Sequence, residues 1–91
     1  DLGDADARHN LPIFLARHSF SLFYGENGVA RDIPKAIDLS REALNLGNMR
    51  IKESFSEMLS TYSVWLFEGE QGFEKNTDKA IELCRQATSL G

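Results

Sequence analysis

The sequence predicts an all-α fold, an α-solenoid of two stacked helix-turn-helix repeats. The Leu-Gly dipeptide occurs at residues 2–3, 46–47 and 90–91, so the spacing is 44 residues both times. In each 44-residue unit, apolar residues recur at helical spacing on both sides of a Gly-rich segment. Fixed periods of roughly 20–50 residues are typical of repeat proteins, in which each unit buries its apolar face on its neighbours.

The two units align without a gap when the sequence is shifted by 44 residues. Identical pairs include Leu22 with Leu66, Gly25 with Gly69, and the dipeptide 35–36 with 79–80. We therefore expect a single repeat domain over residues 1–91, with repeat one at about 4–47 and repeat two at about 48–91. We also expect it to be a fragment of a longer array, so that repeat one exposes an apolar flank.

The first helix of each repeat is the longer one. In repeat two it is predicted over about 49–67, with one apolar stripe made of Ile51, Phe55, Met58, Leu59, Tyr62 and Leu66. A strip of small residues beside the stripe, which includes Ser56 and Ser63, favours close approach of a second helix. In repeat one, Pro12 leaves two alternatives: the helix begins there with Asn10 as its cap, or it kinks.

The second helix of each repeat has clear ends. In repeat one, Asp32 is the predicted cap, Pro34 lies in the first turn, and Gly47 ends the helix. In repeat two the helix is predicted over about 77–90, capped by Asn76 or Thr77. Its apolar side contains Ala80, Ile81, Leu83, Cys84, Ala87 and Leu90. Leu39 and Leu83 are expected to be buried at equivalent places.

Charge and composition exclude several classes of function. The net charge is −4, the pI is about 5.0, and acidic and basic residues are interspersed. Nucleic-acid binding requires a clustered basic face, so neither nucleic acid nor a membrane surface is an expected partner. The single cysteine and the absence of an Asn-x-Ser/Thr site favour a reducing compartment such as the cytoplasm.

No residues with the spacing of a catalytic or metal site were found. The segment 25–28 lacks the Lys-Ser/Thr that follows a phosphate-binding loop, and a turn between helices explains its glycines. His9 and His18 have no third ligand, and His18 aligns with Tyr62 as a packed residue. Cys84 aligns with Ser40 and is expected to be buried. We therefore expect no enzymatic activity, cofactor or metal.

A third face of the long helices remains, and it is our candidate lining for a groove. It contains Arg17 and Tyr24 in repeat one and Thr61 and the edge of Trp65 in repeat two. Aromatic residues and Arg are enriched at binding hot spots, so these four are the predicted partner-binding residues. The alternative for Trp65 is that it packs against a neighbouring repeat.

The segment GENGVARDIPKAIDLSREALNLGN resembles the sel-1-like repeat family, a relative of the tetratricopeptide repeats. The matching positions include Gly28-Val29, Asp32, Lys35-Ala36, Ala43 and Gly47. Repeat two departs from the family pattern with Asn76 in place of Asp. The resemblance implies an α-solenoid that acts as an adaptor between proteins, and it brings no catalytic residues.

These observations predict a non-enzymatic scaffold or adaptor whose first-helix face binds a peptide or protein. The rival interpretation is a structural spacer or self-association segment, in which exposed repeat ends stack on other copies. A third is a regulatory region of an enzyme whose catalytic domain lies elsewhere in a longer chain.

Overall fold

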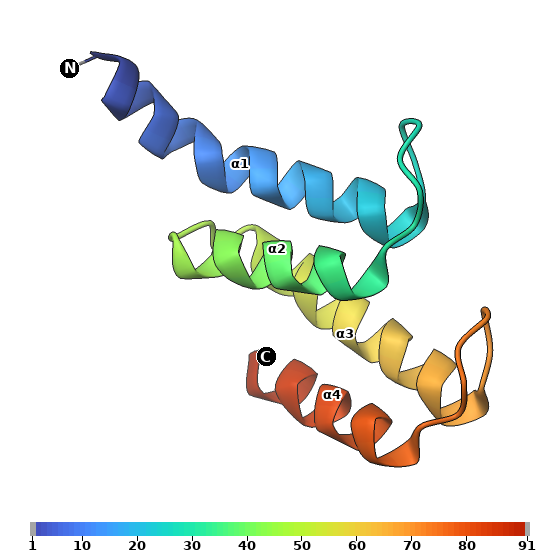
Figure 1. Cartoon of the computed structure of the whole chain (residues 1–91). Helices are drawn as coiled ribbons and strands as arrows, with labels where there is room; N and C mark the ends of the chain where they lie inside the picture. Colours follow the sequence, from blue (N-terminus) through green and yellow to red (C-terminus); the bar gives the residue numbers. More distant parts are fainter. Residues whose placement is uncertain (1, 91) are drawn as a thin grey trace. The chain divides into compact units, whose positions relative to one another are not determined.

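The computed structural model describes residues 2–90, and side chains from residue 7 onward. These residues form four helices, and no strand occurs among them: α1 (Leu2–Tyr24), α2 (Ile33–Asn45), α3 (Ile51–Glu68) and α4 (Thr77–Leu90). The chain divides into two compact units, residues 1–52 and 53–91. Each unit contains one antiparallel helical hairpin, α1 with α2 and α3 with α4 (Figure 1). The all-α helix-turn-helix prediction is confirmed.

The first hairpin begins with a helix that continues through its proline. α1 includes Pro12, so Asn10 is an interior residue and does not cap the helix, and the helix does not begin at Pro12. The Asn48 side chain, which follows α2, donates from Nδ2 to the carbonyl oxygen of Pro12 at 3.2 Å. This bond fixes the far end of α2 against the middle of α1.

The caps of the second helices confirm the sequence pattern. The Asp32 carboxylate accepts a hydrogen bond from the amide of Lys35 at 3.2 Å, and Pro34 lies in the first turn of α2. In repeat two, Asn76 Oδ1 accepts from the amide of Lys79 at 3.1 Å, which selects Asn76 over Thr77 as the cap of α4. Both side chains satisfy an amide that the helix itself leaves without a partner.

The Gly-rich turns reverse the chain with left-handed backbone conformations. The φ values of Gly25 and Gly69 are 70° and 72°, conformations that glycine adopts without a Cβ clash. Each turn then returns to the preceding helix, because the amide of Asp32 donates to the carbonyl of Leu22 and that of Asn76 to the carbonyl of Leu66, at 2.8 and 2.7 Å. The two copies thus repeat the same closure.

In the second hairpin, the predicted strip of small residues on α3 faces α4. Ser56 Oγ donates to the carbonyl of Ala87 at 3.2 Å, and Ser63 Oγ lies 3.2 Å from Cys84 Sγ. Small side chains allow two helices to approach closely, and the hydroxyls add polar contacts across the seam. The apolar stripe predicted on α3 is buried throughout, at 0 to 5% exposure, for Ile51, Phe55, Met58, Leu59, Tyr62 and Leu66.

Four expectations about burial are wrong. His18 is exposed, although its aligned residue Tyr62 is 5% exposed. Leu39 is half-buried, whereas Leu83 is 6% exposed as expected. Ile81 is 45% exposed, and Cys84 is also exposed. Helical periodicity identifies the apolar side of a helix, but it does not say whether another element covers that side.

Candidate protein-binding surfaces

Arg17 and Tyr24 lie on the same side of α1. Seven residues separate them, which is about two helical turns or roughly 10 Å along the axis. Arg17 is exposed, and Tyr24 is 44% exposed. The Tyr24 ring contacts two other aromatic rings, with centroid distances of 5.1 Å to Phe20 and 4.9 Å to Phe23. Tyr24 is thus an exposed aromatic side chain whose orientation is restricted by packing.

Between these two residues, the turn of repeat one covers part of the face. Asn27 Nδ2 donates to Ser21 Oγ at 2.9 Å, and Ser21 is only 9% exposed. Asn27 itself has a positive φ of 57°, which asparagine tolerates better than most residues. The surface that remains accessible on this side of α1 therefore includes Arg17, Phe20 and Tyr24.

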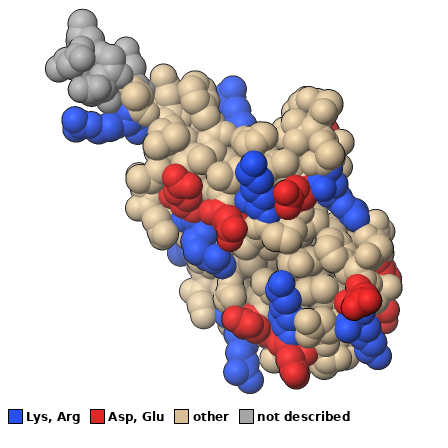
Figure 2. All heavy atoms as spheres, in the orientation of Figure 1, with Lys and Arg blue, Asp and Glu red and all other residues tan. Residues whose placement is uncertain are grey.

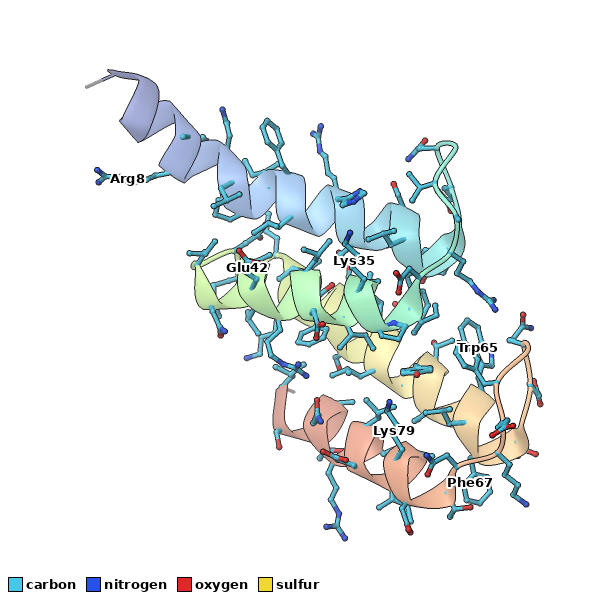
Figure 3. The ribbon with its side chains drawn as sticks, viewed as in Figure 1. Arg8, Lys35, Glu42, Trp65, Phe67 and Lys79 are labelled. Carbon is cyan, nitrogen blue, oxygen red and sulfur yellow. The ribbon has the colours of Figure 1, made fainter. Side chains whose placement is uncertain are left out.

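In repeat two, Thr61 and Trp65 lie one turn apart on α3, and both are half-buried. The Trp65 ring stacks on Phe73 at a centroid distance of 6.2 Å and an interplanar angle of 11°. Phe73 belongs to the turn of the same repeat, so Trp65 packs within its own hairpin. The sequence analysis does not predict this contact. Trp65 lies near the turn end of the hairpin (Figure 3). The turn supports the indole from one side.

Phe73 also contacts the ring of Tyr62, and the Lys79 ammonium group lies over that ring. Its ring lies edge-on to Tyr62, with centroids 5.1 Å apart, and Lys79 Nζ lies 5.8 Å from the centroid of Tyr62. These contacts have the geometry of aromatic pairs and of a cation–π interaction. They make a rigid aromatic cluster behind Trp65, which reduces the entropy cost of using that side chain in binding.

The structure contains a second apolar surface that the sequence analysis did not predict. An open cleft of about 720 Å³ lies between α3 and α4, and exposed apolar side chains contribute much of its lining. Val64, Phe67 and Ile81 are 51%, 47% and 45% exposed, and Cys84 lies beside them. The sequence analysis places Ile81 and Cys84 on the apolar side of the last helix and expects them to be buried, whereas it assigns no role to Val64.

The charged residues form no site of their own. Lys, Arg, Asp and Glu are interspersed on the visible face (Figure 2). Arg41 Nη1 lies 3.9 Å from Asp38 Oδ1 on the exposed side of α2, and exposed ion pairs of this kind contribute little stability. Within residues 7–90, no group of three His, Cys, Asp or Glu side chains could hold a metal ion.

None of the helices, over the residues that the structure describes, combines the length and the hydrophobicity of a membrane span.

Comparison with protein families gives a match to the Sel1 repeat at two places, residues 13–48 and 58–91, which together cover more than half of the chain. Each match includes most of one hairpin, with its Gly-rich turn. No curated protein and no solved structure matches the chain.

Proposed function

Because the chain belongs to the Sel1 repeat family, we propose that it is a protein-binding module whose long helices, α1 and α3, present the binding face. Sel1 repeats generally mediate protein–protein interactions, and the repeat is a non-catalytic helical unit of the tetratricopeptide-like solenoid class. The proposal adds a location in each unit, Arg17 and Tyr24 on α1 in the first and Thr61 and Trp65 on α3 in the second. It also adds a partner class, a peptide or the surface of another protein.

We choose the long-helix residues because of one observation about their aromatic side chains. Each repeat holds an accessible aromatic side chain there, Tyr24 or Trp65, in a fixed arrangement with other rings. Aromatic anchors of this kind offer a large contact area and lose little conformational freedom on binding. Arg17 adds a planar donor that fits a carboxylate or a backbone carbonyl of the partner.

The test measures the affinity of a partner, first selected against the parent chain from a peptide library, for a set of variants. Arg17→Ala removes the guanidinium from an exposed position, so the fold should persist. Trp65→Phe keeps a ring against Phe73 and removes the indole. Truncation of a true anchor costs about 2 kcal/mol or more, so Arg17→Ala should weaken binding roughly thirtyfold.

Arg50→Ala serves as the matched control, because it removes an exposed arginine outside the proposed face. It should leave both the affinity and the melting temperature nearly unchanged. If Arg17→Ala and Trp65→Phe bind the selected peptide as tightly as the parent does, the long-helix face is not the binding surface. In that case the cleft between α3 and α4 becomes the surface to test.

A further inference from the structure

Phe20 joins Arg17 and Tyr24 in one exposed row of side chains on α1, which we call the α1 row. The three residues are spaced by three and four positions, so they lie within about 60° of one another around the helix. Arg17 is exposed, and the rings of Phe20 and Tyr24 are 41% and 44% exposed. The row thus places one cation beside two aromatic rings, and these residue types are enriched at binding hot spots.

The accessibility of the α1 row recurs at the same positions of repeat two. A shift of 44 residues gives Thr61, Val64 and Glu68. Val64 is 51% exposed, Glu68 is exposed and Thr61 is half-buried. Since these positions reach solvent in both units, their accessibility is a property of the repeat and not of the place of one unit in the chain.

The two rings of the α1 row form a single apolar platform. The centroids of Phe20 and Tyr24 lie 5.1 Å apart, and their planes are inclined by 39°. Tyr24 also meets Phe23 edge-on at 4.9 Å, and Phe23 is fully buried. These contacts attach the platform to the core of the first hairpin, so a partner's apolar side chain can pack on it with little loss of ring freedom.

The guanidinium of Arg17 forms no ion pair within residues 7–90. From Ala7 to Tyr24, α1 has no acidic residue. Its two aspartates, Asp4 and Asp6, precede Arg17 by at least 11 positions, which is about 16 Å along the helix axis. That separation exceeds the screening length of about 8 Å at physiological ionic strength. The charge of Arg17 is therefore available to an anionic group of a partner.

From the charge and the platform we propose that the α1 row binds a peptide segment in which an acidic side chain lies close to an apolar one. The inference rests on the proposed protein-binding function and adds the chemistry of the partner for the first unit. Arg17 binds the carboxylate through its planar fork of donors, and the Phe20–Tyr24 platform receives the apolar side chain.

Helix geometry fixes the spacing of the two partner residues. Along the axis of α1, Phe20 and Tyr24 lie about 4.5 and 10.5 Å beyond Arg17. An extended segment places alternate side chains about 6.6 Å apart on one face, and a helical segment places residues i and i+4 about 6 Å apart. The acidic and apolar residues of the partner should therefore be two to four positions apart.

Repeat two does not offer the same surface to this partner. Thr61 stands where repeat one has Arg17, and Glu68 stands where it has Tyr24. An acidic segment would meet a like charge there and no cation at the position of Arg17, and unlike charges are what fix a partner's orientation at an interface. The preference for an acidic and apolar segment should therefore belong to the first unit alone.

The test starts with selection of peptides from a random display library on the parent chain. Selected peptides are synthesised with acetylated and amidated ends, so that any carboxylate comes from a side chain. They should contain Asp or Glu two to four positions from an aromatic or large aliphatic residue. Replacement of that acidic residue by its amide in the peptide should weaken binding at least about tenfold.

Charge exchange is the decisive measurement. Arg17→Glu should bind the acidic peptide at least about tenfold more weakly than the parent does, and it should bind the peptide with Lys at the acidic position more tightly than the parent does. An unfolded variant could not show that gain. Phe20→Ala and Tyr24→Ala should weaken both peptides. Arg50→Ala and Phe67→Ala remove an exposed arginine and a 47% exposed ring outside the α1 row, and both should bind like the parent.

The outcomes separate this inference from the proposed function. Peptides that lose affinity in Arg17→Ala but show no acidic preference overturn the acidic partner and leave the proposed face intact, because Arg17 then binds a backbone carbonyl. Peptides that bind Arg17→Glu, Phe20→Ala and Tyr24→Ala as tightly as the parent overturn both the inference and the proposed location on α1. A library that yields no peptide for the parent also overturns both.

Discussion

Replacement of Phe73 should affect stability and the Trp65 environment together. The Phe73 ring contacts Tyr62 at 5.1 Å and Trp65 at 6.2 Å, and both distances lie in the range of favourable aromatic pairs. Each pair contributes about 0.5–1.5 kcal/mol beyond area burial. Phe73 is half-buried, so its burial adds less than that of a core residue. Phe73→Ala should therefore lower the free energy of unfolding by about 2 kcal/mol.

The assay uses the single tryptophan of the chain. Urea unfolding is followed by Trp65 fluorescence and by circular dichroism on the same samples. For a chain of this size, a loss of about 2 kcal/mol corresponds to a decrease in melting temperature of roughly 10 °C. The native emission should also shift to longer wavelength, because the indole loses the ring that shields one of its faces.

Val29→Ala is the matched control, since Val29 occupies the same place in the turn of repeat one and has no ring. It should cost less than about 1 kcal/mol, the range of a modest truncation at a half-buried site. A loss of less than about 0.5 kcal/mol for Phe73→Ala, together with an unchanged emission maximum, would refute the view that this cluster holds Trp65 in place.

Three other predictions concern repeat two. Leu83→Ala should lower the free energy of unfolding by about 2–5 kcal/mol in urea, because Leu83 is 6% exposed; a cost below about 0.5 kcal/mol would place it outside the core. Gly69→Ala should cost roughly 1–2 kcal/mol, since its φ is 72° and a Cβ would lie 3.4 Å from that of Lys75. Gly72→Ala should cost less, because nothing lies within 4 Å of its added Cβ. Cys84 is exposed, so a thiol reagent should label it in the native chain; protection until unfolding would contradict the open cleft.

The sequence was sufficient for the helices and their ends because these features depend on local interactions. The 44-residue shift located the turns, and the caps at Asp32 and Asn76 each involve an amide only three residues away. The small-residue strip on α3 also proved informative, since close packing of two helices needs small side chains at their seam. Pro12 was the exception, because local rules allow both a helix start and an interior position.

Burial and binding could be predicted only in part. Ile81 has the helical spacing of a core residue, and its exposure depends on whether another element covers that side of α4. The contact of Trp65 with Phe73 was missed because a loop residue carries no periodic signal. The binding role of Arg17, Tyr24, Thr61 and Trp65 stays a prediction, since it requires a partner.

The hydrogen bond from Asn48 to Pro12 has a consequence for local opening of α1. Proline has no amide hydrogen, so the carbonyl of Arg8 lacks its usual helical donor, and the helix is weakest just before residue 12. The Asn48 side chain binds the carbonyl of Pro12 itself, and Ser19, Leu22 and Phe23 beyond it are buried. Amides of residues 7–11 should therefore exchange with deuterium early, whereas those from Ser19 onward should exchange only when the first hairpin unfolds as a unit.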